Sequence, residues 1–424
     1  MTNPKRKIFA DMSRKKSSGA GETLQKGAEK AATRAIKSAG RKEARKLFRK
    51  IPLKYILATI GIVLVLFVAA LFVPERYVPA FLEKPHTALL TWRNRMIRQN
   101  RLPFSFYDDV HFLTNPGTDP IQIYFAPSPK ICPALCSLIR SATSSIAVCA
   151  FDIKLEAVAD ALIEAKERKI SVRVVTDTDY LGNPALERIS RAGIPIVSDR
   201  KRTLMHNKFV VVDGRYVWTG SYNLTDNGTW KNDNNAILIE SPEVAAGYLA
   251  RFEQYWQDRF SSAGKRTELP QQVFIGRLPA FYAFSPSDGV LKVLLHELSQ
   301  AKSSVDVMAF SFTGAELAAK LRELAGRGVR IRCLFDYGQS KNKASRDEYL
   351  KKIGAQVFYS PNRRGRMHHK VFIIDGKTVI TGSYNFSKNA ESGNDENILM
   401  LRSEAVAKLY TEEMDRCIRG IKGY

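Results

Sequence analysis

An internal repeat constrains the fold of this chain more than any other feature. Between positions 119 and 420, the segment SATSSIAVCAF (141–151) returns as QAKSSVDVMAF (300–310). Further along, MHNKFVVVDGRYVWTGSYN (205–223) returns as MHHKVFIIDGKTVITGSYN (367–385) at nearly the same offset. The two copies lie too far apart for a solenoid unit, so the repeat is a duplicated domain. The sequence therefore predicts two similar halves within one chain.

Each half alternates predicted strands with predicted helices. Apolar runs such as SSIAVCAF and SSVDVMAF predict buried strands, and EAVADALIEAKERK and GAELAAKLRELAGR predict amphipathic helices. The segments around Asp213-Gly214 and Asp375-Gly376 predict hairpins, because Asp-Gly favours a tight turn between strands. We therefore expect an α/β fold in which each half is a mixed sheet flanked by helices. The pattern does not predict the order of the strands.

One motif within the repeat combines histidine, lysine and polar side chains at fixed spacing. It reads His206-x-Lys208-x4-Asp213-x6-Gly220-Ser221-x-Asn223, and it recurs as His368-x-Lys370-x4-Asp375-x6-Gly382-Ser383-x-Asn385. Histidine and lysine at alternate positions on a strand point to the same face, so both can contact one phosphate.

The residue types of this motif suit the cleavage of a phosphodiester. Two lysines, helped by serine and asparagine donors, can neutralise the charge that builds on the phosphoryl oxygens. One neutral imidazole can attack phosphorus while the other, protonated, donates to the leaving oxygen. Metal binding is the rival interpretation of the two histidines, but the neighbouring ammonium groups oppose a cation and few carboxylates accompany them. We expect neither a metal nor another cofactor.

The paired motif resembles the signature of the phospholipase D superfamily, which is His-x-Lys-x4-Asp followed by Gly-Ser-x-Asn. The tails SYNLTDNGTWKNDNN and SYNFSKNAESGNDEN most resemble the branch of bacterial endonucleases and mitochondrial cardiolipin hydrolases. Those relatives carry one motif and dimerise, so the resemblance implies that this chain forms a pseudo-dimer. It also implies catalysis by His206, Lys208, His368 and Lys370, with Ser221, Asn223, Ser383 and Asn385 binding substrate.

The resemblance also implies a carboxylate that supports a catalytic histidine from the opposite half. The position at the expected spacing after each motif histidine is Asn234 in the first half and Glu396 in the second. Only Glu396 is a carboxylate, so it joins the predicted catalytic residues. Either the first half is partly degenerate or the two histidines have unequal roles, and we favour unequal roles because every other motif position is intact.

The remaining candidate residues are interpreted as structural. Asp213 and Asp375 fit the turn of a hairpin better than a chemical role. His86, His111, His296 and His369 are treated in the same way, as are all five cysteines. Basic loops at 199–202 and 362–366 precede the two motifs and could attract an anionic substrate.

An uncharged apolar run at 55–73 is long enough to cross a bilayer as one helix. Residues 1–54 carry 17 lysines and arginines against four acids, a net of +13 that leaves +11 for the rest of the chain. Because positive charge favours the cytoplasmic side, the sequence predicts a single-pass membrane protein with a cytoplasmic N-terminus and the catalytic domain on the far side. The predicted boundaries are a tail (1–54), a transmembrane helix (55–73), a linker (74–118), the first half (119–262), a second linker (263–276) and the second half (277–420).

These features predict a phospholipase D-type hydrolase that cleaves membrane phospholipid headgroups through a phosphohistidine intermediate. An endonuclease acting on DNA or RNA is the first alternative, because the chain is basic and its motif tails resemble those of nucleases. Transfer of the phosphatidyl group to a second alcohol, as in cardiolipin synthesis, uses the same chemistry. A silent binding module is the third reading, although a pseudoenzyme should also have lost a motif histidine or lysine.

Overall fold

The strands of the first half form one mixed sheet of eight strands, as the alternation of strands and helices predicts. Their order is β1 (His111–Leu113), β2 (Ile121–Ala126), β8 (Asn234–Glu240), β7 (Tyr216–Gly220), β6 (Lys208–Val212), β3 (Ser145–Ala150), β4 (Ser171–Thr176) and β5 (Ile196–Ser198). Neighbours β3, β4 and β5 are parallel, whereas the other neighbouring pairs are antiparallel.

The second half repeats this sheet with the same pairing. Its order is β13 (Gln356–Tyr359), β12 (Arg330–Phe335), β11 (Ser304–Ala309), β14 (Lys370–Ile374), β15 (Thr378–Gly382), β16 (Glu396–Arg402), β10 (Leu278–Ser285) and β9 (Gln272–Ile275). The two predicted hairpins are β6–β7 and β14–β15. Asp213 and Asp375 adopt positive φ angles of 54° and 53° at their turns, a conformation that aspartate tolerates better than most residues.

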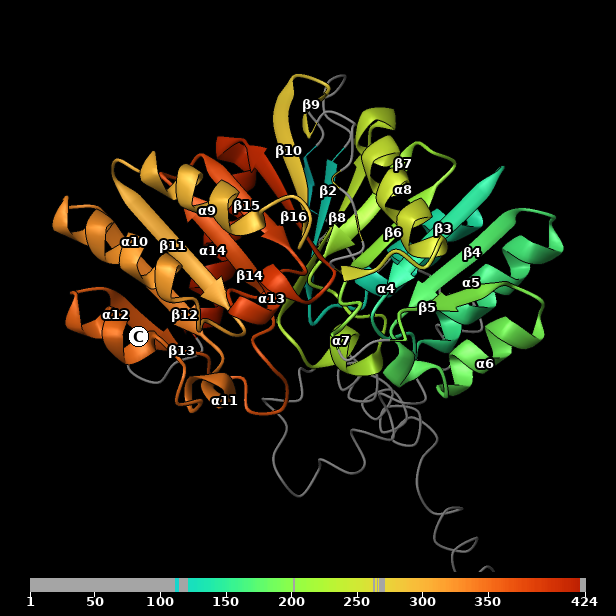
Figure 1. Cartoon of the computed structure of the whole chain (residues 1–424), viewed down its shortest axis with the longest axis horizontal. Helices are drawn as coiled ribbons and strands as arrows, with labels where there is room; N and C mark the ends of the chain where they lie inside the picture. Colours follow the sequence, from blue (N-terminus) through green and yellow to red (C-terminus); the bar gives the residue numbers. More distant parts are fainter. Residues whose placement is uncertain are drawn as a thin grey trace, which may run out of the picture. The chain divides into compact units, whose positions relative to one another are not determined.

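Helices flank both sheets (Figure 1). In the first half they are α4 (Ile131–Arg140), α5 (Glu156–Glu167), α6 (Pro184–Arg191), α7 (Asp226–Trp230) and α8 (Pro242–Trp256), with the short 3-10 helix η6 (Thr178–Tyr180). In the second half they are α9 (Val290–Ser299), α10 (Ala315–Gly326), α11 (Tyr337–Ser340), α12 (Asp347–Lys352), α13 (Lys388–Ser392) and α14 (Glu404–Arg419). The predicted α/β fold with two mixed sheets flanked by helices is confirmed.

The computed structural model describes residues 111–113, 121–200, 203–261, 264, 266 and 271–419. The predicted tail, transmembrane helix and nearly all of the first linker lie outside these residues, as do Lys201 and Arg202 of the first basic loop. Among the helices that the structure does describe, none is both long enough and apolar enough to cross a membrane.

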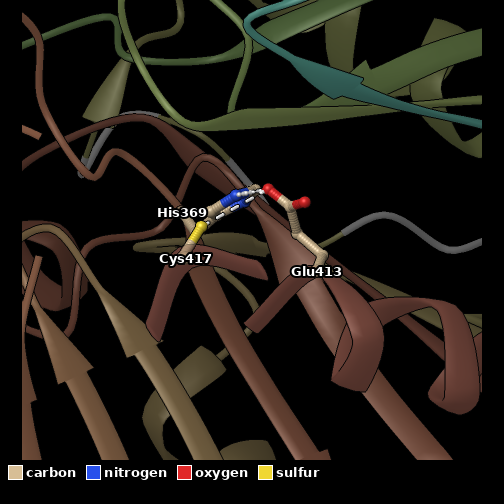
Figure 2. Close-up of side chains that lie close together, drawn as sticks. All are labelled: His369, Glu413 and Cys417. Carbon is tan, nitrogen blue, oxygen red and sulfur yellow. Dashed lines mark hydrogen bonds and ion pairs between the residues drawn. The ribbon is translucent and has the colours of Figure 1, made fainter. Parts of the chain in front are cut away.

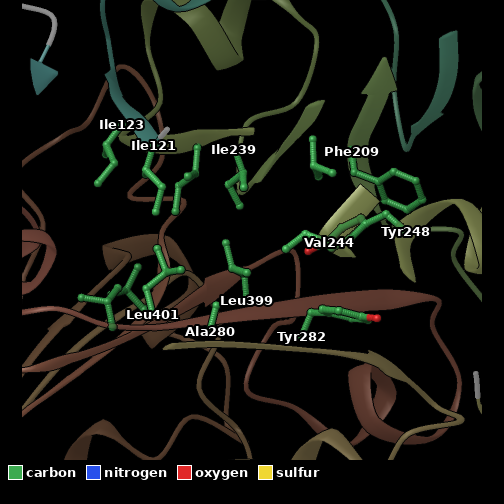
Figure 3. Close-up of a cluster of buried hydrophobic side chains, with 14 of the residues drawn as sticks. Ile121, Ile123, Phe209, Ile239, Val244, Tyr248, Ala280, Tyr282, Leu399 and Leu401 are labelled. Atoms are coloured by element: carbon green, nitrogen blue, oxygen red, sulfur yellow. The ribbon is translucent and has the colours of Figure 1, made fainter. Parts of the chain in front are cut away.

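The inner faces of the two sheets share one hydrophobic core. Alternate residues of β6 divide between two clusters, because successive side chains of a strand point to opposite faces. Phe209 and Val211 pack into the shared core, whereas Val210 and Val212 pack beneath the outer helices of the first half. Figure 3 shows side chains of the first sheet, such as Ile239, facing those of the second, such as Leu399. Burial of this apolar surface therefore fixes one half against the other.

Candidate active site

The two motif histidines lie at the seam between the halves, just before the first residues of β6 and β14. The backbone N–H of His206 donates to the carbonyl of Asp395 at 2.9 Å, and that of His368 donates to the carbonyl of Asp233 at 2.9 Å. Each hydrogen bond joins one half to the other. The backbone of each motif is therefore positioned by the opposite half, and both motifs contribute to one site.

The His206 imidazole is paired with a buried carboxylate of the second half. Its Nδ1 lies 2.7 Å from Oε2 of Glu396, the first residue of β16. Glu396 is completely buried, and its other carboxylate oxygen accepts a 3.3 Å hydrogen bond from Nδ2 of Asn394. When Glu396 is ionised it accepts the Nδ1 proton of His206, which leaves the lone pair of Nε2 available for chemistry.

The His368 imidazole faces a neutral amide in the equivalent position. Its Nδ1 lies 2.8 Å from Oδ1 of Asn234 and 3.1 Å from the carbonyl oxygen of Ser221. Nδ2 of Asn234 donates to the carbonyl of Gly228 at 3.0 Å, which turns the amide oxygen toward the histidine. Nδ1 of His368 therefore faces two acceptors, which favours a proton on Nδ1 and leaves the lone pair on Nε2. These contacts agree with unequal roles for the two histidines.

The motif lysines are buried beside the histidines that they follow. Nζ of Lys208 donates to the carbonyl of His206 at 2.5 Å, and Nζ of Lys370 donates to that of His368 at 2.8 Å. Lys208 and Lys370 are 3% and 2% exposed, respectively. Two buried ammonium groups in one site create a strong preference for a bound anion.

Burial and mutual repulsion weaken the basicity of the four motif side chains. Burial lowers the pKa of both histidines well below the ordinary value, and the charges of both lysines lower it further. Burial also lowers the pKa of Lys208 to about 7 and that of Lys370 well below its usual range. Burial raises the pKa of Glu396 to about 7. Lys208 and Glu396 thus change charge near neutral pH, as groups that take part in acid-base chemistry often do.

The motif serines follow β7 and β15 and join these strands to β8 and β16, respectively. Oγ of Ser221 accepts the backbone N–H of Asn235 at 3.0 Å, and Oγ of Ser383 accepts that of Asn397 at 3.0 Å. The glycine of the first motif is required here, because Gly220 has a φ of 143° and a Cβ atom would collide with the carbonyl of Asn235. The serines therefore shape the strand ends that surround the histidines.

The motif asparagines, Asn223 and Asn385, each hold a buried amide oxygen with no hydrogen-bond partner in the described part of the chain. A buried unpaired polar atom costs free energy unless a ligand satisfies it. These two amides are consistent with the predicted role in substrate binding.

The motif aspartates lie at the opposite ends of β6 and β14, away from the histidines. The carboxylate of Asp213 accepts backbone N–H groups of Thr143, Ser144 and Ser145, with a shortest distance of 2.8 Å. Asp375 makes the same contacts with Lys302, Ser303 and Ser304, with a shortest distance of 2.7 Å. Both aspartates therefore fasten the loop that precedes the neighbouring strand.

A second group of titratable side chains lies around His369, whose ring points toward Glu413 and Cys417 (Figure 2). Ligand atoms of His369, Glu413 and Cys417 lie within 4.8 Å of one another. Nε of Arg416 lies 2.7 Å from one oxygen of Glu413, and a terminal nitrogen of Arg416 lies 2.8 Å from the other. A guanidinium held on both carboxylate oxygens opposes a bound cation, so this cluster is an ion-pair network.

Sequence reasoning missed the two aromatic residues that flank the histidines. The ring centroids of Phe151 and His206 are 4.8 Å apart, and those of Phe310 and His368 are 4.9 Å apart. Each phenylalanine ends the first matched block of the internal repeat, at the same place in both copies. Their matched positions in the two copies could have identified them as site residues. A phenylalanine at the end of a buried strand is equally typical of a core residue, however.

The two halves of the chain match a known family profile, described as "Cardiolipin synthase, PLD-like domain", at residues 135–256 and 294–418. These segments cover more than half of the chain. The chain belongs to this phospholipase D-like family. The resemblance inferred from the paired motifs is thereby confirmed.

Individual relatives match smaller parts of the chain. The mitochondrial cardiolipin hydrolase of Mus musculus is 35% identical over 130 residues, which are 31% of this chain and 58% of that protein. A phospholipase D of Rickettsia conorii is 33% identical over 131 residues, 30% of this chain and 64% of that protein. The matched region is thus less than two thirds of either relative. The phosphatidylserine synthase structure of Haemophilus influenzae is 15% identical with a TM-score of 0.56, covering 70% of this chain and 86% of that one, and it supports the fold alone.

Proposed function

We propose that the chain is a phosphodiester hydrolase whose single active site is shared by its two halves and acts through a phosphohistidine intermediate. The main support is a pair of contacts between the halves. Glu396 of the second half lies against Nδ1 of His206, and Asn234 of the first half lies against Nδ1 of His368. A symmetric pair of His-Lys units supplies a nucleophile, an acid and a charge clamp at one phosphate.

In the first step, Nε2 of His206 attacks phosphorus while the bond from phosphorus to the leaving alcohol breaks. The leaving oxygen takes the proton of Nε2 of His368. His368 must therefore begin the step as an imidazolium, and the negative charge of the bound phosphodiester favours this charged form against burial and the two lysines. Lys208 and Lys370 neutralise the charge on the non-bridging oxygens. His206 is the proposed nucleophile because a carboxylate on its Nδ1 increases the basicity of the ring, whereas neutral Asn234 leaves His368 the better proton donor.

In the second step, water attacks phosphorus and the phosphorus–nitrogen bond breaks. The water gives one proton to Nε2 of His368, which restores the imidazolium, and His206 returns as a neutral imidazole. Transfer to a second alcohol in place of water would follow the same path and would give a transferase. Hydrolysis is the lead assignment, because water needs no second binding site.

The proposed substrate is a membrane phospholipid. The support is the apolar run at 55–73, which would hold the catalytic domain close to lipid headgroups and raise their effective concentration. We propose that the N-terminus is cytoplasmic and that the catalytic domain lies on the far side of the membrane, on the grounds of the charge bias. The names of the relatives, cardiolipin hydrolase and phospholipase D, are consistent with a lipid substrate.

The test is product analysis with the full-length protein in detergent micelles, with a chelator present to silence contaminating metal nucleases. Phosphatidylcholine, phosphatidylglycerol and cardiolipin are compared with single-stranded DNA and RNA, and the His206→Asn variant is the blank. We expect release of the headgroup alcohol and formation of phosphatidic acid. Cleavage of nucleic acid with every lipid left intact would replace the lipid assignment by the endonuclease alternative.

A further inference from the structure

The surface beside His368 carries an unusual concentration of positive charge. Two segments, 337–346 and 361–366, contain six cationic side chains and no acidic one. We call them the basic rim, and their cations are Lys341, Lys343, Arg346, Arg363, Arg364 and Arg366. Five of these six residues are exposed, and Arg346 is half-buried.

The basic rim is fixed at the edge of the active site. The carboxylate of Asp336 accepts the backbone N–H of Gln339 in α11 at 2.9 Å and that of Met367 at 3.1 Å. Because Met367 directly precedes His368, these bonds hold α11 against the motif. The rim therefore borders the catalytic groups of the second half.

The arginine-rich segment of the rim is also fastened to the first half. Nδ2 of Asn362 donates to the carbonyl of Lys231 at 2.7 Å and to the carboxylate of Asp233 at 2.9 Å. Gly365 packs so closely on the Lys231 carbonyl that a Cβ atom at this position would collide with it. The segment is thus fixed in place by the first half, and its cations lie near the site before any substrate binds.

An aromatic ring organises two of the cations. Tyr337 is 39% exposed, and the guanidinium carbon of Arg363 and Nζ of Lys341 lie 3.5 and 4.4 Å from its ring centroid. Neither Arg363 nor Lys341 forms an ion pair with a carboxylate in the part of the chain that the structure describes. A guanidinium held flat on a ring keeps its N–H donors directed outward, which suits a phosphate.

We propose that the basic rim is a second anion subsite, which binds a phosphate adjacent to the scissile phosphodiester. The inference rests on the proposed function. Since the rim lies on the side of His368, the proton donor to the leaving group, the adjacent phosphate belongs to the leaving alcohol. The preferred substrate is therefore a lipid whose leaving alcohol carries a second phosphodiester, and a zwitterionic choline headgroup is a poor substrate.

The first test compares substrates with and without the second phosphate. Full-length protein in detergent micelles is assayed with cardiolipin, phosphatidylcholine and bis(p-nitrophenyl) phosphate, and the test variant is Lys341→Ala/Arg363→Ala. Lys302→Ala/Lys377→Ala is the matched control, because it removes two exposed cations of the same half next to the Asp375 turn, at the other end of β14. We expect kcat/KM for cardiolipin to fall about 10-fold in the test variant, with little change for bis(p-nitrophenyl) phosphate.

Three results of the turnover assays would overturn the subsite. An equal loss in the control variant would reduce the effect to overall charge, and an equal loss with every substrate would make the rim a support of the fold. Single-stranded DNA is assayed beside these substrates. If the rim variant cleaved DNA more slowly but cardiolipin at the unaltered rate, the rim would bind nucleic acid instead.

A second measurement needs no turnover: isothermal titration should show tighter binding of glycerol 1,3-bisphosphate than of glycerol 1-phosphate. If the unaltered protein shows no such preference, the subsite is wrong, whether or not the protein is a hydrolase.

Discussion

At the scale of single residues, Glu396 and Asn234 make the two motif histidines chemically different. An ionised Glu396 accepts the Nδ1 proton of His206 and keeps Nε2 unprotonated. A protonated Glu396 would instead donate to Nδ1, and the remaining ring proton would move to Nε2, where it blocks attack on phosphorus. Asn234 has no such titration, so a neutral His368 keeps its proton on Nδ1.

This difference predicts the pH dependence of the reaction. Because burial raises the pKa of Glu396 to about 7, kcat/KM should fall as the pH drops through about 7. Because burial lowers the pKa of Lys208 to about 7, kcat/KM should also fall on the alkaline side, where this ammonium loses its charge. The Glu396→Gln variant should lose about 100-fold in rate and should lose the acidic limb while keeping the alkaline limb. If kcat/KM of Glu396→Gln still fell near the same acidic pH, the acidic limb would belong to another group.

At the scale of elements, helix α14 fastens the second half to the strand end that carries Asn234. A terminal nitrogen of Arg416 lies 3.1 Å from Oδ1 of Asp233, and the same side chain binds Glu413, which in turn lies 3.1 Å from Nε2 of His369. The backbone carbonyl of Asp233 accepts the N–H of His368 at 2.9 Å. The network therefore links the last turns of α14 to the seam beside His368.

The Arg416→Met variant tests this link. Removing the guanidinium leaves the nearly buried carboxylates of Asp233 and Glu413 without their arginine partner. We expect the free energy of unfolding to fall by about 3 kcal/mol, the lower end of the usual range, because Arg416 is 37% exposed and both carboxylates keep another hydrogen bond. Asp415→Asn on the same helix is the control. The Asp415 side chain, which pairs with Arg332, is 40% exposed, so its loss should lower the free energy of unfolding by less than about 1 kcal/mol.

The same variant should show a characteristic pH dependence of stability. The pKa of Glu413 is lowered from its ordinary 4.5 to about 2 by hydrogen bonds and charge from Arg416 and His369, which outweigh burial. A lowered pKa adds stability above pH 4.5 that is lost as the pH falls toward about 2. The difference between the unaltered protein and Arg416→Met, measured by denaturant titration, should therefore shrink over that interval. A difference independent of pH would mean that Arg416 acts by packing alone.

Much of this element-scale picture followed from the sequence. The repeat predicted two halves, and the Asp-Gly turns predicted the hairpins β6–β7 and β14–β15. Strand order did not follow, because β2 pairs with β8, which lies at the far end of the same half, and nothing local encodes that pairing. The Arg416 network was also invisible, since a charged residue near the end of a helix is ordinarily solvated. His369 could be placed only on the face opposite the motif, and its partners on α14 required the structure.

At the scale of the whole molecule, the proposed membrane anchor would decide where the site meets its substrate. The charge bias around 55–73 predicts a cytoplasmic N-terminus. A protease site near residue 20 should therefore be protected in intact cells, and one placed between 263 and 276 should be cut from the far side. The opposite pattern of cleavage would contradict the charge-bias argument.

One site from two halves is the central claim, and the phosphoenzyme tests it most directly. Full-length protein is mixed rapidly with phosphate-labelled phospholipid, denatured without acid and mapped by mass spectrometry. We predict at most one phosphatidyl group per chain, bonded through phosphorus to His206, with no label in His206→Asn and no turnover in either His206→Asn or His368→Asn. Label on both histidines of one chain, or half of the activity remaining in either variant, would mean two independent sites and would contradict the account.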